Sequence, residues 1–209
     1  MGRIARPAGE NKPAMRERLL SAALELFTSK GYAATSVREI VASANVTKPV
    51  LYYYFGNKEG IYLELMQGPF QHVDAMLEEC RRNTGSCADR CKSLCDRTLQ
   101  LFIENLQTAR LMYSIYYGPP QGAPFFDFDG YHDKLHDVTR ELIEEGIASG
   151  EFRDVPVADM TWVILGVLTV AMEEQLCRAE PRFDQEGLAR VLDLILAGFA
   201  PQKREGVCA

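Results

Sequence analysis

The chain has 209 residues, 47% of them hydrophobic and 25% charged, which is enough apolar content for a proper core and excludes a disordered chain. The net charge is −6, but residues 1–60 hold nine basic and five acidic side chains, so the acidic excess belongs to the remainder. A basic N-terminal part suits a phosphate-bearing partner. The N-terminus lacks the apolar segment of a signal peptide, and the apolar stretch Trp162–Met172 is too short to span a bilayer, which favours a cytoplasmic protein.

Hydrophobic residues recur at helical spacing along nearly the whole chain, and no alternating strand pattern with hairpin turns appears. The sequence therefore predicts an all-α protein of about nine helices. We expect residues 1–12 to form a flexible basic arm and residues 201–209 a tail. Between them, we expect a small N-terminal domain at residues 13–60 and a larger helical domain at residues 61–200.

The N-terminal domain begins with two predicted helices. The first spans residues 13–30, and Gly31 stands where a helix C-terminus commonly needs a left-handed residue. Ser36 and Glu39 have the spacing of a capping box, which predicts a second, short helix over residues 36–43.

A tight turn and a third short helix follow. Asn45 tolerates a positive φ and suits the turn, and Thr47 is a natural N-cap for a helix that ends near Phe55. Leu51 and Phe55 are four residues apart and are expected to face the core. Two short helices joined by such a turn indicate a helix-turn-helix, which places the N-terminal side chains of its second helix on base edges in the DNA major groove.

The third helix and the starts of its neighbours carry hydroxyl, amine and tyrosine groups that suit phosphate oxygens and base edges. Each has a plainer interpretation, because tyrosines at a helix end can pack in the core and lysines can be solvated surface charges. The predicted DNA-binding residues are Ser36, Thr47, Lys48, Pro49, Tyr52, Tyr53, Tyr54 and Lys58.

The stretch GYAATSVREIVASANVTKPVLYYYFGNKEGIY resembles the DNA-binding domain of the tetracycline-repressor (TetR) family, over about residues 14–63. Residues 146–153, GIASGEFR, are similar to a segment at the end of the seventh helix of that family. Three residues depart from the family pattern: Asn45 stands where Gly is frequent, Pro49 where Gly or Ala is frequent, and Tyr54 where His is frequent. None of these breaks the fold, although Pro49 removes a backbone donor from the recognition helix.

The resemblance implies a homodimer that represses transcription from a palindromic operator and leaves it when a small molecule binds the C-terminal domain. The fourth helix, capped by Asn57, is the expected lever between the two domains, and Gly68-Pro69 is expected to kink or break it. No enzymatic motif is recognised, and neither a cofactor nor a metal is expected. The expected partners are operator DNA, a small-molecule effector and a second copy of the chain, in the bacterial cytoplasm.

Residues 102–128 are rich in aromatic side chains, which favours a pocket for a small, largely apolar or aromatic molecule bordered by the loop at 118–124. Ordinary core packing is the alternative for each of them. The helix from Phe125 to Ser149 is expected to follow this loop. The predicted pocket residues are Met66, Phe70, Phe102, Met112, Tyr113, Tyr116, Tyr117, Phe125 and Trp162.

The last two predicted helices, at residues 157–178 and 184–199, are unusually apolar. The segment from Trp162 to Met172 is apolar nearly all round, so we expect it to be buried on every side. An apolar face in excess of what a small core needs suggests a subunit interface. The predicted interface residues are Leu165, Leu168, Leu192 and Leu196.

Two further patterns have a sensing interpretation. Cys87, Cys91 and Cys95 recur every four residues, so a cysteine- or metal-responsive regulator is the alternative function. His132 and His136 are also four apart, beside several aspartates. Core packing for the thiols and a solvated helix face for the histidines are the interpretations that these spacings favour, because a tetrahedral metal site usually needs a closer pair.

Overall fold

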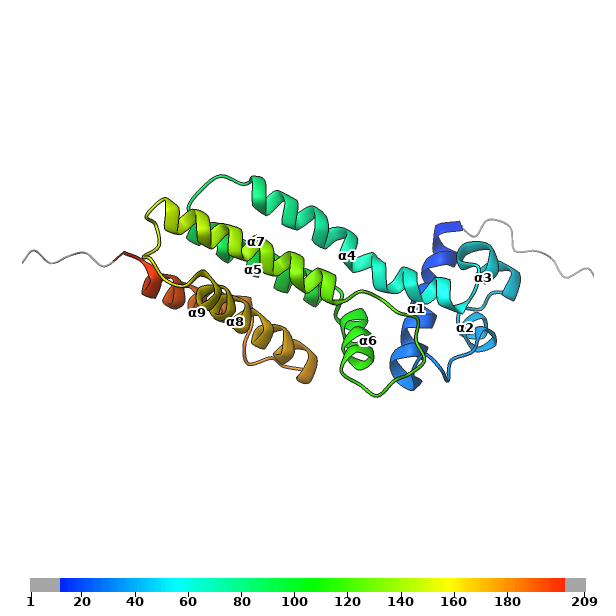
Figure 1. Ribbon diagram of the computed structural model, residues 1–209. Helices are drawn as coiled ribbons and strands as arrows, with labels where there is room; N and C mark the ends of the chain where they lie inside the picture. The colour runs from blue at the N-terminus through cyan, green and yellow to red at the C-terminus, as the bar shows by residue number, and fades with distance from the viewer. Residues whose placement is uncertain (1–11, 202–209) are drawn as a thin grey trace, which may run out of the picture. The chain divides into compact units, whose positions relative to one another are not determined.

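The computed structural model describes residues 12–201, and these form nine α-helices without a strand (Figure 1), which confirms the predicted all-α fold. The predicted arm and tail therefore lie outside the described residues, apart from Lys12 and Pro201. The helices are α1 (Lys12–Lys30), α2 (Val37–Ser43), α3 (Lys48–Phe55), α4 (Lys58–Arg82), α5 (Cys87–Glu104), α6 (Leu106–Tyr116), α7 (Asp129–Ala148), α8 (Val157–Cys177) and α9 (Gln185–Phe199).

The described chain forms two compact units. The first unit contains the residues up to Gly68 together with Gln107–Phe126, and the second contains Pro69–Leu106 and the residues from Asp127 onward. This division places most of α6 in the same unit as the N-terminal helices. The predicted boundary near residue 60, which separates a DNA-binding domain from a ligand-binding domain, stays a prediction.

Helix α4 passes through Gly68 and Pro69 without a break, so of the expected kink or break the break is wrong. Proline in a helix interior lacks one donor, and its ring crowds the residue before it. That residue is Gly68, which has no Cβ to crowd. The local sequence therefore tolerates the proline, and α4 remains one helix of 25 residues.

The core of the first unit is built around three aromatic rings. The ring of Tyr32, in the connection between α1 and α2, lies 5.3 Å from that of Phe27 and 5.1 Å from that of Tyr62, measured between centroids. Leu19 on α1 and Leu51 on α3 are fully buried beside other apolar residues. These contacts hold α2 and α3 against α1, because α1 packs on both of the shorter helices.

The second unit is organised around α5, which packs against α7, α8 and α9. Cys87, Cys91 and Cys95 all lie in its apolar core. Burial raises the pKa of the Cys91 thiol to about 12 and also raises that of Cys87, so the reactive thiolate is disfavoured. Among residues 12–201, no three His, Cys, Asp or Glu side chains gather in a way that could hold a metal ion. The three thiols are core residues, and nothing supports the cysteine- or metal-responsive alternative.

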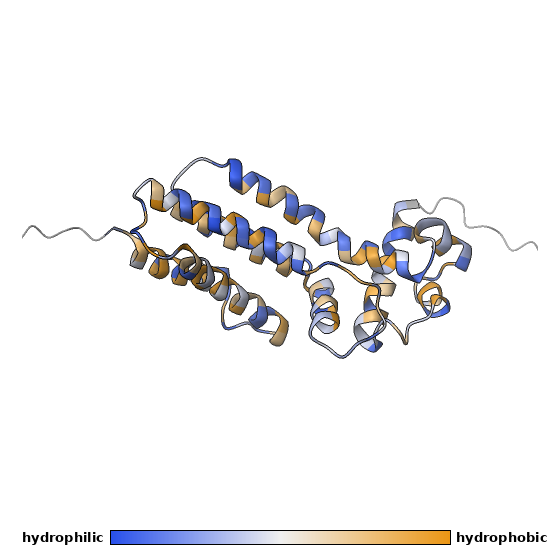
Figure 2. Ribbon diagram, viewed as in Figure 1, coloured by the Kyte–Doolittle hydropathy of each residue, from blue (hydrophilic) through white to orange (hydrophobic). Residues whose placement is uncertain are grey.

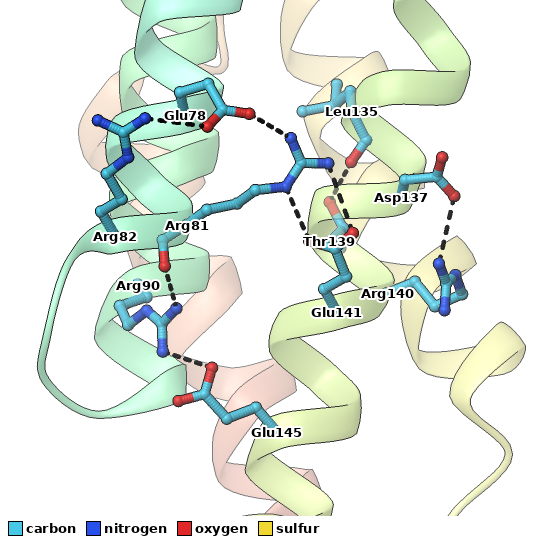
Figure 3. A network of polar contacts seen from close by, with 10 residues as sticks. All are labelled: Glu78, Arg81, Arg82, Arg90, Leu135, Asp137, Thr139, Arg140, Glu141 and Glu145. Atoms are coloured by element: carbon cyan, nitrogen blue, oxygen red, sulfur yellow. Dashed lines mark hydrogen bonds and ion pairs between the residues drawn. The ribbon is translucent and has the colours of Figure 1, made fainter.

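Polar contacts tie the C-terminal end of α4 to α5 and α7 (Figure 3). Arg81 donates from Nε to Glu141 Oε2 at 2.8 Å and pairs with Glu78 at 2.9 Å. The buried Arg90 donates to Glu145 at 2.6 Å and to the carbonyl oxygen of Arg81 at 3.2 Å. A buried cation needs such partners, so these contacts fix the last turns of α4 within the second unit.

Helix α7 begins at Asp129, four residues later than predicted from Phe125. The carboxylate of Asp127 accepts a hydrogen bond from the backbone N–H of Gly130 at 3.0 Å and so satisfies a donor of the first turn. The aromatic residues just before Asp127 therefore belong to the connection after α6, where Phe125 is 88% exposed.

Helix α8 is buried on one side only, which corrects the expectation that Trp162–Met172 is buried all round. Ile164 and Leu168 face the core, whereas Trp162 is 67% exposed. Most residues in the middle of this helix are apolar, so its sequence says little about which side faces the core (Figure 2). By length and composition alone, α8 is long and apolar enough to cross a membrane, a property that the core helices of soluble proteins share.

The predicted subunit-interface leucines need the same correction. Leu168, Leu192 and Leu196 lie in the core of their own subunit, and Leu165 packs against it while partly buried. The exposed apolar residues of α8 and α9 are different ones: Trp162, Val163, Val170 and Leu194.

Candidate nucleic-acid interface

The connection between α1 and α2 is held by backbone carbonyls. Gly31 adopts the predicted left-handed conformation, with φ of +85°, and its N–H donates to Phe27 O at 3.0 Å. The hydroxyl of Thr35 then donates to the carbonyl oxygens of Leu26 and Gly31, at 3.2 and 2.9 Å. These bonds fix the direction in which the chain enters α2.

Helix α2 begins with the predicted capping box. Ser36 Oγ accepts from the N–H of Glu39 at 3.3 Å, and the Glu39 carboxylate accepts from the N–H of Ser36 at 2.8 Å. The same carboxylate accepts from the Ser36 hydroxyl and pairs with Lys30, which lowers the pKa of Glu39 to about 2. Ser36 is thus occupied within the protein, beside a negative charge that opposes a phosphate. The structure favours a capping role for Ser36 in place of the predicted DNA contact.

The turn between α2 and α3 is as tight as predicted. Asn45 has a φ of +51°, the one positive value outside glycine among the described residues. The N–H of Ala44 donates to Ile40 O and that of Val46 to Val41 O, each at 2.9 Å. The short turn sets α3 directly after α2, which is the geometry of a helix-turn-helix.

Helix α3 buries one side and exposes the other. Leu51 is fully buried and Phe55 half-buried, in line with the expected core face. On the opposite side Thr47, Lys48 and Pro49 are exposed at the start of the helix. Thr47 is the N-cap residue, yet its side chain makes no capping bond. Its hydroxyl is therefore not committed to the helix end.

Two tyrosines extend this exposed side. Tyr52 is 48% exposed and Tyr53 is 73% exposed. The ring of Tyr53 meets that of Tyr54 edge-on, with 5.0 Å between centroids, and Tyr54 in turn lies 6.1 Å from Phe55. Tyr54 is half-buried and braces its neighbour. The exposed ring of Tyr53 is thus supported along one edge.

Lys58 makes its contacts within the protein, and the predicted phosphate contact stays a prediction. Its ammonium group donates to the carbonyl oxygens of Tyr32 and Thr35, at 2.9 and 3.0 Å, and lies 4.1 Å from the centroid of the Tyr32 ring. Desolvation lowers the pKa of Lys58. The ammonium group therefore points into the protein, and its hydrogen bonds link the start of α4 to the connection between α1 and α2. Asn57, by contrast, caps α4 as predicted, accepting from the N–H of Gly60 at 2.8 Å.

Arg38 is a cation that the sequence-based prediction missed. It lies exposed on α2 and, within the described structure, has neither an acidic partner nor a hydrogen bond to the protein. Lys48 on α3 is likewise exposed, with no acidic or hydrogen-bonding partner among the described residues, whereas Lys30 pairs with Glu39. The sequence could have indicated Arg38 as a DNA-contacting residue, because the first helix of a helix-turn-helix crosses the DNA backbone and Arg38 lies on its outer side.

The predicted pocket residues are distributed over both units, and the pocket itself stays a prediction. Met66 is buried in the first unit, where Tyr117 and Phe125 are exposed, while Phe70 and Trp162 belong to the second unit. A surface hollow of about 290 Å³ does lie between α5 and α9. Its lining is a different set: Lys92, Ser93, Asp96, Gln185, Leu188, Ala189 and Leu192.

Residues 19–65 match the family model described as "Bacterial regulatory proteins, tetR family". Among curated relatives, the HTH-type transcriptional activator FasR of Mycolicibacterium smegmatis is 33% identical over 129 residues, covering 56% of this chain and 58% of FasR. This match spans less than two thirds of the relative's length. The HTH-type transcriptional repressor KstR2 of the same organism is 28% identical over 175 residues, covering 75% of this chain and 81% of KstR2.

Solved structures share the fold of the whole chain. The TetR family transcriptional regulator PfmR from Thermus thermophilus matches with a TM-score of 0.68 and 26% identity, covering 90% of this chain and 98% of PfmR. AibR, solved with isovaleryl coenzyme A and operator DNA, matches with a TM-score of 0.62 over 90% of this chain and all of AibR, and at 18% identity this likeness shows the fold alone.

The exposed α3 behind a tight turn, on an all-helical body, defines the class of helix-turn-helix regulators. The family match and the relatives agree with this class: residues 19–65 match the TetR family of bacterial regulatory proteins, and the relatives that the chain is similar to are transcriptional regulators.

Proposed function

We propose that this protein is a ligand-responsive repressor that binds operator DNA as a homodimer in the bacterial cytoplasm. The observation that carries the DNA-binding part is the outer side of α3, where Thr47, Lys48 and Tyr53 are exposed and their polar side-chain groups make no hydrogen bond or ion pair with another described residue. Side chains left free at the N-terminal end of a recognition helix are available to the major groove.

The cationic contacts to DNA are proposed to come from both helices of the motif. Arg38 on α2 and Lys48 on α3 are exposed cations that no acidic side chain neutralises among the described residues. The hydroxyls of Tyr52 and Tyr54 suit phosphate oxygens, since tyrosine donates readily to them. The positive balance of residues 1–60 adds a longer-range attraction to the same partner.

The DNA-binding proposal is tested with Lys48→Ala and Tyr53→Ala in the full-length protein. An operator is first selected from a randomised duplex pool, and affinity is then measured against salt concentration. We expect Lys48→Ala to weaken binding about tenfold or more and to reduce the salt slope by about one, since each protein cation placed at the DNA releases roughly one counterion.

The matched control is Tyr117→Ala, because Tyr117 is 70% exposed in the same unit but lies outside the motif. It should bind DNA as the native protein does, and all three variants should stay dimeric. Undiminished affinity in both α3 variants would refute this site.

The effector is proposed to be a small molecule with a substantial apolar part that binds the C-terminal helical region. The aromatic and methionine side chains of α4 to α6 support this class, as does the isovaleryl coenzyme A in the AibR structure. The ligand relieves repression if it binds better to a conformation of the dimer that fits the operator poorly.

The effector proposal is tested by adding isovaleryl coenzyme A or a long-chain acyl coenzyme A to the protein–operator complex, with free coenzyme A as the control. Release of DNA by an acyl form but not by coenzyme A supports an apolar effector of this class. Release by neither form contradicts the acyl assignment and leaves the DNA-binding test unaffected.

A further inference from the structure

The outer side of α3 carries two chemically different strips. Residues four apart lie on one face of a helix, so Lys48 is aligned with Tyr52, and Pro49 with Tyr53. All four are exposed. One strip therefore begins with an amine and the other with an apolar ring, about 100° apart around the helix axis.

Pro49 has almost nothing to offer a polar base edge. Pro49 has no backbone N–H, and its side chain is purely apolar. In the major groove, the apolar group on the edges of the base pairs is the C5-methyl of thymine. An exposed proline in the first turn of a recognition helix therefore matches a thymine methyl better than any other base-edge group.

The Tyr53 ring strengthens this match. It continues the apolar strip one turn further along and is 73% exposed. Because Tyr54 supports one edge of the ring at a centroid distance of 5.0 Å, less conformational freedom is lost when the other edge is buried against DNA.

The Lys48 strip has the opposite character. A lysine ammonium offers three donors and no acceptor. Among the described residues it has no acidic or hydrogen-bonded partner that would compete with a base. Guanine presents two acceptors, O6 and N7, on its major-groove edge, and is the base that lysine reads best.

We infer that each operator half-site contains a thymine recognised through its methyl group by Pro49 and Tyr53, with a guanine recognised by Lys48 within about two base pairs of it. Lys48 and Pro49 are consecutive residues, and one residue advances along the helix by less than a base-pair step. This readout rests on the proposed DNA-binding function and states which bases give it sequence specificity.

The test uses the full-length protein and an operator selected from a randomised duplex pool. Each thymine in the half-sites is replaced in turn by deoxyuridine, which deletes the methyl and keeps the base pair. We expect one position to lose affinity about fourfold per methyl, the effect of burying one methylene-sized group. Replacing the neighbouring guanine with 7-deazaguanine, which lacks the N7 acceptor, should cost about tenfold.

Two variants show which residue recognises the thymine methyl and which recognises the guanine N7. Pro49→Ser should bind thymine and deoxyuridine operators equally, and Lys48→Met should lose its discrimination against 7-deazaguanine. Pro119→Ser, a change at an exposed proline after α6, is the matched control and should keep both discriminations.

The outcomes separate the two levels of the proposal. Selection of an operator without any thymine position sensitive to the methyl overturns the readout and leaves DNA binding standing. The same holds if Pro49→Ser retains the full methyl dependence of the native protein. Failure to select any operator sequence would overturn the DNA-binding function itself, and the readout with it.

Discussion

Gly146 lies on α7 at the point where the ring of Phe152 folds back over the helix. A Cβ at this position would lie 2.3 and 2.4 Å from two ring carbons of Phe152 and 3.1 Å from the Cβ of Cys87 on α5. The N–H of Phe152 also donates to Gly146 O at 2.9 Å, which fixes the ring beside the helix. At the GIASGEFR segment, α7, α5 and the ring of Phe152 approach one another closely. Packing therefore requires a glycine at the start of the segment.

Gly146→Ala is therefore expected to lower the free energy of unfolding by about 2 kcal/mol, the usual cost of forcing an extra carbon into a well-packed core. Chemical denaturation of Gly146→Ala, Phe152→Leu and the double variant measures it. Because the ring is the main obstacle, the double variant should be more stable than additivity predicts, by about 1 kcal/mol. Strictly additive effects would show that the ring and the glycine do not compete for space.

At the scale of elements, the start of α2 depends on one carboxylate. Glu39 accepts hydrogen bonds from the side chain of Lys30 and from the side chain and backbone of Ser36, which together hold its pKa at about 2. A lowered folded-state pKa means that the stabilisation is complete above the ordinary pKa of about 4.5. It is lost as the pH falls from there toward 2, because the unfolded chain takes up the proton first.

The predicted consequence is a difference in melting temperature between the native protein and Glu39→Gln that is constant near neutral pH, shrinks below about pH 4.5 and vanishes near pH 2. Thermal unfolding followed by circular dichroism at several pH values measures it. The same comparison in a Lys30→Met background should give a smaller difference, since Lys30 is the largest cause of the shift. A difference that persists at pH 2 would contradict the role given to the ionised carboxylate.

The sequence predicted these local features because each depends on residues close together in the chain. The Ser36–Glu39 box, the positive φ of Asn45 and the ends at Gly31 and Asn57 all concern interactions within about four residues. For the same reason the turn and the exposed side of α3 were predictable.

Features that depend on distant partners were not predictable in this way. Lys58 turns inward to the carbonyl oxygens of Tyr32 and Thr35, more than twenty residues away, so its position in the pattern gave no sign of these partners. The position of Arg38 on α2 was visible in the sequence, but only the structure shows that Glu39 pairs with Lys30 and that Arg38 has no ion-pair partner among the described residues. The buried side of α8 was likewise hidden, since a helix that is apolar all round has no face that the sequence distinguishes.

At the scale of the whole molecule, the second unit leaves large apolar residues uncovered after its own core is complete. Trp162 on α8 is 67% exposed and Leu194 on α9 is 75% exposed, while Leu168 and Leu192 nearby are buried inside the subunit. Exposed apolar residues of this size on two helices suit a contact with a second copy of the chain. The proposed dimer would present two α3 helices to a palindromic site.

Leu194→Glu is expected to dissociate this dimer, because a two-fold contact would bury the new carboxylate twice without a partner. The mass in solution, from light scattering, should fall to that of one chain, and affinity for the full palindrome should fall toward that for a half-site. Tyr117→Glu places the same charge at a 70% exposed aromatic position of the first unit and should leave the mass unchanged. If both Leu194→Glu and Trp162→Glu remained dimeric with native operator affinity, the subunit contact would have to lie on another surface. If only the mass changed and the affinity did not, a single α3 would suffice for binding and the palindrome would not be required.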